Sequence, residues 1–222
     1  MSDGGISYRW FNPRGDKVLV RNFAHCHEEI IRPEIADKWK TCRVCNESWS
    51  RKKEPFLESI GFMHCGIPVV DVWSVDSFVT YIFDKINPMT GATCWLACKD
   101  GQVIGYCWGF MENLDNLEDR LDAPGLTRFI KRKFGDFETV AFQDRIGVLE
   151  AYRKMGIATA LFSRRLGNFI ESDMKVGITL LSRKTASFVL DWYKSRGYVP
   201  IYDFKDSNGN IIVARSLEGL IF

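Results

Sequence analysis

Residues 146–158 of the chain read Ile146-Gly147-Val148-Leu149-Glu150-Ala151-Tyr152-Arg153-Lys154-Met155-Gly156-Ile157-Ala158. The apolar start predicts a strand, and apolar residues at helical spacing after Gly156 predict a helix. A helix that begins directly after a strand presents unpaired backbone N–H groups at the positive end of its dipole. Such a junction can bind a phosphate-sized anion, and the small residues Gly156 and Ala158 leave room for one. An ordinary strand-to-helix turn, with small residues for packing, is the alternative interpretation.

The residues on either side of this junction predict a mixed α/β fold. Residues 93–99 and 102–111 are rich in aromatic and β-branched residues and flank Asp100-Gly101, a pattern that predicts a hairpin. Residues 138–149 predict the strand that leads into the junction. The other expected elements are a strand at 67–73, a helix at 75–86, helix and loop at 114–133, a helix beginning at 156, a strand at 177–182, a helix at 185–195, and a strand pair at 198–204 and 210–216.

Length and composition point to one main domain with a small appendage. The chain has 222 residues, of which 46% are apolar and 26% charged, and no apolar run is long enough to cross a bilayer. We therefore expect no membrane association. The net charge of +2 gives no overall field that favours nucleic acid, although residues 128 and 131–133 form a local basic group. Residues 1–5 lack the pattern of a secretory signal, so we expect a cytoplasmic protein.

The seven cysteines are odd in number and argue against a disulfide framework. Cys42 and Cys45 form a C-x-x-C pair, whose tight turn can direct two thiolates at one tetrahedral metal ion. The predicted ligands of a structural zinc ion combine this pair with a cysteine and a histidine upstream: Cys42, Cys45, Cys26 and His27. Other ligands in the same region stay open: His25, His64 and Cys65. A redox pair, or cysteines that bind nothing, are the alternatives.

These patterns divide the chain in two. Residues 1–60 contain most of the cysteine and histidine cluster and only short apolar segments, so they are predicted to form a small module that a metal would stabilise. Residues 61–222 contain the regular strands and helices and are predicted to form the main domain.

The junction resembles the acetyl-coenzyme A signature of the GNAT N-acetyltransferase superfamily. In that signature a hydrophobic strand ends in valine and is followed by roughly P-x-Y-R-G-x-G-I-G and an amphipathic helix. The matching residues are Val148, Tyr152, Arg153, Gly156 and Ile157, with Ala158 in place of the last glycine. Residues 192–198, Trp-Tyr-Lys-Ser-Arg-Gly-Tyr, are similar to the family's F-Y-x-x-x-G-F element. The resemblance implies the GNAT fold, a central mixed and twisted sheet flanked by helices.

The resemblance further implies acetyl-coenzyme A (acetyl-CoA) as cosubstrate. Its pantetheine is expected to pair with backbone groups of Ile146 and Val148, as a short extra strand would. Its pyrophosphate is expected on the turn that follows, at Arg153, Lys154, Met155, Gly156, Ile157, Ala158 and Thr159.

Three groups are expected to carry catalysis. The backbone N–H of Val148 would polarise the thioester carbonyl, because a donor fixed before the reaction stabilises the developing oxyanion. Tyr193 stands at the family's tyrosine position and would protonate the departing thiolate, with packing in a core as its alternative role. Asp144 would be the general base, because period-two alternation places it on the same face as Ile146 and Val148. Glu112, Glu150 or a water relay are alternatives to Asp144.

The expected activity is direct transfer of the acetyl group, in a ternary complex, to an amine of a small molecule or peptide. Transfer to a protein N-terminus or lysine is an alternative, as is a different acyl group. A non-catalytic alternative is an acyl-CoA-sensing module with a zinc-containing recognition segment. The oligomeric state is open, with a homodimer as one possibility.

Overall fold

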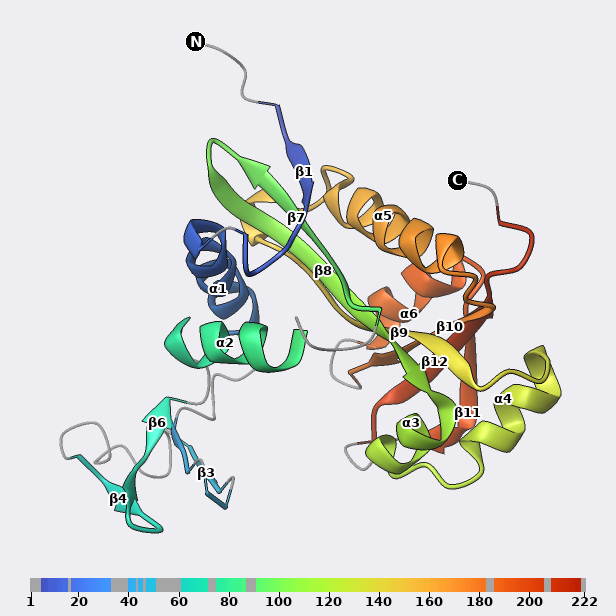
Figure 1. Cartoon of the computed structure of the whole chain (residues 1–222), viewed down its shortest axis with the longest axis horizontal. Helices are drawn as coiled ribbons and strands as arrows, with labels where there is room; N and C mark the ends of the chain where they lie inside the picture. Colours follow the sequence, from blue (N-terminus) through green and yellow to red (C-terminus); the bar gives the residue numbers. More distant parts are fainter. Residues whose placement is uncertain are drawn as a thin grey trace.

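The computed structural model describes residues 5–15, 17–32, 40–42, 44–45, 47–50, 61–71, 75–86, 91–182, 186–205 and 209–220. Within these residues, seven strands form one large sheet with helices on both of its faces (Figure 1). The predicted mixed α/β fold is confirmed.

The large sheet has the strand order β1-β7-β8-β9-β10-β12-β11. Neighbouring strands are antiparallel except for β9 and β10, which run parallel. The strands are β1 (Ser7–Trp10), β7 (Thr93–Lys99), β8 (Gln102–Asn113), β9 (Thr139–Val148), β10 (Val176–Leu181), β11 (Val199–Lys205) and β12 (Ile211–Ser216). The parallel pair therefore lies near the middle of the sheet, where β9 ends at the junction described above.

The hairpin predicted across Asp100-Gly101 joins β7 to β8. Lys99 lies opposite Gln102, so the loop has two residues. Asp100 and Gly101 have φ angles of 51° and 79°, the left-handed conformations that a tight two-residue turn between twisted strands requires. The prediction is therefore confirmed down to the turn residues.

Helices cover both faces of the large sheet. One face is covered by α1 (Lys17–Ile31), by α2 (Val75–Tyr81) with its π-helical continuation Ile82–Ile86, and by α3 (Leu114–Leu121) and α4 (Leu126–Phe134). The opposite face is covered by α5 (Ile157–Glu171) and α6 (Ala186–Lys194). Each helix presents apolar side chains to the sheet, as amphipathic helices of this length do. Among the described residues, no helix has the length and apolar character that crossing a membrane requires.

The first described elements are part of this main fold. β1 pairs antiparallel with β7, and Phe23 and Ala24 of α1 are fully buried against the sheet. The domain boundary at residue 60 stays a prediction, but β1 and α1 pack with the elements that follow it.

A separate group of short strands lies between α1 and α2 in the chain. β2 (Lys40–Thr41), β3 (Ser48–Trp49) and β6 (Val70–Asp71) form a sheet of order β3-β2-β6, and β4 (Met63–His64) pairs with β5 (Ile67–Pro68). We call the described residues 40–50 and 61–71 the Cys/His insert. It lies beyond α2, apart from the large sheet (Figure 1). The single strand predicted at 67–73 is thus two short strands of different sheets, with residues 72–73 outside the described residues.

Candidate functional site

The two central strands diverge. β9 and β10 are paired only where Gly177 lies opposite Ala141 and Ile178 opposite Phe142. On its other side, β9 stays paired with β8 as far as Val148. Residues 143–148 of β9 therefore have one edge without a partner strand among the described residues.

The hydrogen-bond register shows which backbone groups face this open edge. The N–H of Leu149 donates to the carbonyl of Ile104 on β8, with an N···O distance of 3.0 Å. In an antiparallel ladder alternate residues point their N–H and C=O groups to the same neighbour, so Gly147 also bonds toward β8. Ile146 and Val148 consequently direct their N–H and C=O groups away from β8, toward the open edge. These are the two residues predicted to pair with pantetheine.

A β-bulge marks the beginning of the divergence. Trp108 lies opposite Arg145 and Phe110 opposite Phe142, so β9 has two residues, 143 and 144, where β8 has one. An extra residue of this kind bends its strand and interrupts the regular ladder.

Arg165 of α5 holds the bulge in place. Its side chain is fully buried, and its guanidinium donates to the carbonyls of Trp108 and Arg145 at 2.9 and 2.8 Å and to Oε1 of Gln143 at 2.8 Å. Thr179 of β10 donates its hydroxyl to the Gln143 carbonyl at 2.6 Å. These bonds satisfy polar groups in the region where the two strands separate. The separation of β9 from β10 is therefore stabilised by specific hydrogen bonds.

The N-terminus of α5 follows the end of β9 after one 3₁₀ turn, Glu150–Tyr152. Gly156 stands at the N-cap position with φ 77°, which favours glycine, and no described side chain caps the helix. A Cβ added at Gly156 would meet no described atom within 4 Å. The N–H groups of the first helical turn have no helical acceptors, so they are available to an anion in the space before Gly156.

Basic side chains surround this turn. Arg153 donates from Nε to the Val148 carbonyl at 3.2 Å, which ties the turn to the end of β9. Lys154 is exposed beside it. Arg196, which follows α6, donates from Nη2 to Oγ1 of Thr159 at 2.9 Å. Arg196 was not among the predicted contacts, and it adds a third cation to the N-terminus of α5.

The structure places the predicted pyrophosphate residues around one exposed turn. Met155 and Thr159 are exposed with Arg153, Lys154 and Gly156, whereas Ile157 is buried and Ala158 half-buried. Ile157 packs with Val148 in the core under α5, so the helix start and the strand end are held together.

Tyr193 of α6 lies in an aromatic core. Its side chain is 3% exposed, and its ring packs edge-on against Phe162, Trp192 and Tyr198 at centroid distances of 6.1, 5.0 and 5.0 Å. Because Phe162 belongs to α5, this packing holds Tyr193 against the helix whose N-terminus forms the candidate anion site. The packing role that the sequence left open is present, and proton donation by Tyr193 stays a prediction.

The prediction that Asp144 shares a face with Ile146 and Val148 was wrong. The Asp144 carboxylate accepts a hydrogen bond from Nε1 of Trp108 at 2.7 Å, and Trp108 packs in the core under α1 and α2. Ile146 and Val148 instead pack in the core under α5. The bulge at residues 143–144 breaks the period-two alternation and turns Asp144 to the opposite face.

Tyr81 of α2 is a second partner of Asp144. Burial, and after it the negative charge of Asp144, raise the pKa of Tyr81 to about 12, so its hydroxyl stays protonated and hydrogen-bonds to the carboxylate. Neither Tyr81 nor Trp108 was predicted from the sequence, because aromatic residues in a helix and a strand give no signal beyond packing. Arg165 did leave a signal, since it interrupts the apolar stripe of α5.

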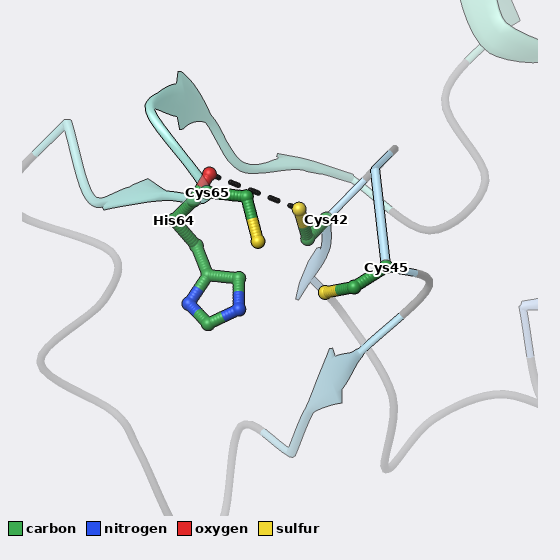
Figure 2. Close-up of side chains that lie close together, drawn as sticks. All are labelled: Cys42, Cys45, His64 and Cys65. Atoms are coloured by element: carbon green, nitrogen blue, oxygen red, sulfur yellow. Dashed lines mark hydrogen bonds between the residues drawn. The ribbon is translucent and has the colours of Figure 1, made fainter.

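Cys42, Cys45, His64 and Cys65 form one cluster in the Cys/His insert (Figure 2). Their three Sγ atoms and one imidazole nitrogen all lie within 4.8 Å of one another. The C-x-x-C pair follows β2, and His64 and Cys65 lie at the turn between β4 and β5. The cluster could hold a metal ion. Its second pair, His64 and Cys65, was among the alternative ligands considered from the sequence.

The prediction of Cys26 and His27 as further ligands was wrong. Both are buried on α1 within the main core. The His27 ring stacks on Phe78 at a centroid distance of 3.7 Å, and its Nδ1 lies 2.8 Å from the Tyr106 hydroxyl. Burial raises the pKa of the Cys26 thiol, while burial and then the charge of Arg145 lower the pKa of His27 to about 3. Position in an amphipathic helix, not proximity in sequence, decides where these two side chains lie.

Comparison with known proteins agrees with this geometry. Residues 68–172 match the sequence model of the acetyltransferase (GNAT) family. No curated protein matches the chain significantly. Among solved structures, the PaiA N-acetyltransferase of Thermoplasma acidophilum, in complex with coenzyme A, is 13% identical with a TM-score of 0.56 over 96% of this chain and 99% of that one.

Two further structures share the fold. An acetyltransferase of the GNAT family from Staphylococcus aureus Mu50 is 13% identical, with a TM-score of 0.51 over 96% of this chain and 100% of that one. An aminoglycoside 6′-acetyltransferase of type Ii is 11% identical, with a TM-score of 0.55 over 97% and 99%. The segment that matches the family model includes β7, β8, β9 and α5, which form the open edge and the candidate anion site. Residues 68–172 therefore form a domain that matches the acetyltransferase (GNAT) family.

Proposed function

We propose that the protein is an N-acetyltransferase, which transfers the acetyl group of acetyl-CoA to an amine of a small molecule or peptide. One observation carries the proposal: the open edge of β9 at Ile146 and Val148 leads directly to the uncapped N-terminus of α5. An extended chain with amide groups can pair with the open edge of β9, and a pyrophosphate can bind to the N-terminus of α5. Pantetheine and pyrophosphate follow each other in coenzyme A in the same order.

The cofactor would be held by backbone and charge together. The amides of pantetheine exchange hydrogen bonds with Ile146 and Val148, and the pyrophosphate accepts bonds from the N–H groups of the first turn of α5. Arg153, Lys154 and Arg196 add positive charge around this turn. The open space before Gly156 supports this assignment, because any side chain there would enter it.

Transfer requires a neutral amine, a polarised carbonyl and a proton for the leaving group. The amine nitrogen attacks the thioester carbon, and the N–H of Val148 donates to the carbonyl oxygen as negative charge develops there. The carbon–sulfur bond then breaks, and the Tyr193 hydroxyl protonates the departing thiolate. The attacking nitrogen loses one proton as the amide forms. Through water this proton returns to the Tyr193 phenolate, and coenzyme A leaves as the free thiol.

Asp144 would receive the proton that the ammonium form of the acceptor loses. Because strand residues rise by about 3.3 Å each, four residues separate Asp144 from Val148 by about 13 Å, so the proton would travel through water. Trp108 and Tyr81 fix the orientation of the carboxylate and leave some of its acceptor positions open to water.

A thiol-release screen tests the proposal. Acetyl-CoA is incubated with the protein and a panel of amines, amino acids, aminoglycosides and peptides, and free coenzyme A and the acetylated product are both measured. The proposal predicts thiol release that depends on the amine, with one acetyl group gained by the acceptor. If acetyl-CoA binds but no amine in the panel releases thiol, the acyl-CoA-sensing alternative is favoured instead.

Replacement of Asp144 by Asn tests the general base. Asn keeps an oxygen that can accept from Trp108 but cannot take a proton, so kcat/KM should fall about 100-fold, within the usual contribution of general acid–base catalysis, while acetyl-CoA affinity is unchanged. Glu112→Gln is the matched control, because the Glu112 carboxylate is held by Arg120. If Asp144→Asn leaves the rate unchanged, or Glu112→Gln lowers it as much, Asp144 is not the base.

A further inference from the structure

The Cys/His insert has almost no apolar core. Cys42, with 0% of its side chain exposed, is the one buried residue among those whose burial the structure describes at 40–50 and 61–69. Each strand of the insert has two residues. The ring of Trp49 contacts those of Phe62 and His64, at centroid distances of 5.4 and 5.1 Å. A folded segment this small and this exposed needs a source of stability other than apolar burial, such as a bound metal ion.

Two tight turns of the insert bring their side chains to one point. In the first, the N–H of Val44 donates to Sγ of Cys42 at 3.4 Å, and the N–H of Cys45 donates to the same sulfur. In the second, Cys65 and Gly66 have φ angles of 49° and 75° and form a two-residue turn between β4 and β5. The sulfur atoms of both turns and the imidazole of His64 converge (Figure 2).

We propose that Cys42, Cys45, His64 and Cys65 bind one Zn²⁺ ion, which holds the two turns of the insert together. Three thiolates and one imidazole are a donor set that favours zinc in tetrahedral coordination. Backbone N–H groups that donate to a ligating sulfur, as Val44 and Cys45 do to Cys42, fix its direction and stabilise its charge. Four protein ligands fill a tetrahedral site, so the ion has no open position for substrate and is structural.

The geometry also separates this site from the proposed chemistry. The insert lies beyond α2, whereas the open edge of β9 and the N-terminus of α5 lie on the large sheet (Figure 1). The zinc proposal therefore does not depend on the proposed acetyltransferase activity. Failure of either one leaves the other standing.

Metal analysis of the full chain, purified without chelator under reducing conditions, is the first test. We expect about one zinc ion per chain, as a closed four-ligand site would hold. Cys42→Ser and Cys65→Ser should each reduce bound zinc to background. Cys26→Ser is the matched control, since Cys26 lies on α1 outside the cluster, and it should keep the full amount. Loss of zinc in the control, or its retention in both cluster variants, would overturn the ligand assignment.

Replacement of the metal in the wild-type chain keeps the test independent of how the variants fold. Cobalt(II) added in place of zinc should give the visible absorption of tetrahedral Co²⁺ and the near-ultraviolet bands of thiolate coordination, with an endpoint at one ion per chain. Zinc should then displace the cobalt and remove these bands. A wild-type chain that takes up neither ion under reducing conditions, or whose four residues bind cobalt only in octahedral geometry, would contradict the proposal.

Discussion

The large sheet and the Cys/His insert are stabilised in different ways. The sheet buries apolar side chains on both faces beneath six helices of the described chain, whereas the insert buries Cys42 alone among its described side chains. Burial contributes about 25 cal/mol for each Å² of apolar surface removed from water, so the sheet can be stable without a ligand, whereas we expect the insert to need one. Hydrophobic periodicity therefore locates the first region in the sequence, and only residue type locates the second.

The largest expected effect is the loss of acetyl-CoA affinity in a variant that changes the proposed cofactor site and leaves the insert intact. In Gly156→Asp, a carboxylate enters the open space before α5 and faces the pyrophosphate. Juxtaposed like charges cost several kcal/mol, and about 1.4 kcal/mol corresponds to a factor of ten, so acetyl-CoA affinity should fall at least about 100-fold. Titration calorimetry measures the affinity, and metal analysis should show the zinc content unchanged.

Gly167→Asp is the control for this variant. Gly167 lies in the interior of α5, and a Cβ there also meets no described atom within 4 Å, so the variant adds the same charge away from the N-terminal turn. It should bind acetyl-CoA nearly as the wild type does. Equal affinity of wild type and Gly156→Asp would remove the proposed pyrophosphate site.

The next largest expected effect is on the rate of acetyl transfer, and it comes from Tyr193 on the large sheet's helix α6. Tyr193→Phe keeps the ring packed against Phe162 but removes the proton donor, so kcat should fall about 100-fold or more with little change in acetyl-CoA affinity. Tyr198→Phe is the control, because the Tyr198 hydroxyl accepts from Gln143 and serves structure. It should lower the free energy of unfolding by about 1–3 kcal/mol and leave kcat near wild type. If steady-state kinetics show a larger loss of kcat in Tyr198→Phe than in Tyr193→Phe, Tyr193 is excluded as the acid.

A pH effect should come from the core of the sheet and not from the insert. The pKa of His27 is lowered to about 3 in the folded chain and is about 6.5 when unfolded, so the unfolded chain binds more protons between these values. Stability is therefore fully present above pH 6.5 and is lost as pH falls toward 3, by about 1.4 kcal/mol per pH unit. Denaturant unfolding at several pH values should show this slope.

Two variants of α1 isolate the contribution of His27. His27→Gln should flatten the slope, because glutamine does not titrate. His25→Gln, on the exposed side of the same helix, should keep it. An unchanged slope in His27→Gln would show that other groups cause the acid sensitivity.

The smallest expected effect is that of metal removal on the cofactor site. Sites that share no partners usually affect each other by no more than about 0.5 kcal/mol, so chelation should change acetyl-CoA affinity by about twofold at most. Over the same treatment, amide hydrogen exchange should become faster in the Cys/His insert and stay unchanged in β8 and β9. A large loss of acetyl-CoA affinity on chelation would show that the two regions are coupled.

Local sequence patterns predicted most of the sheet. Asp100-Gly101 gave the hairpin, and the apolar stripe after Gly156 gave α5, because both depend on residues close in the chain. The pairing of β1 with β7 was not predicted, since Ser7 and Cys98 lie 91 residues apart. The first strand has four residues, too few to show a periodicity of its own.

The sequence predicted the backbone of the candidate site, but it did not predict the direction of the Asp144 side chain. The edge at Ile146 and Val148 follows from where β9 ends, which the sequence shows. The bulge at residues 143–144 has no such signal, because it depends on Arg165 and Thr179 from elements far along the chain. It turned Asp144 to the other face, which no count along the strand could anticipate.

The proposed metal ligands show the same limit. Cys42 and Cys45 share one turn and could be paired by spacing alone. Their partners could not, because the choice between Cys26 with His27 and His64 with Cys65 depends on which segment returns to that turn. The helix α1 carries the first pair into the core, and the β4–β5 turn brings the second pair back.

A crystal structure of the full chain with coenzyme A tests the central claim most directly. We predict that the pyrophosphate lies on the N–H groups of residues 154–159 and that pantetheine exchanges hydrogen bonds with the backbone of Ile146 and Val148. A structure in which side chains fill the turn at Gly156, with coenzyme A bound elsewhere or absent at saturating concentration, would contradict it.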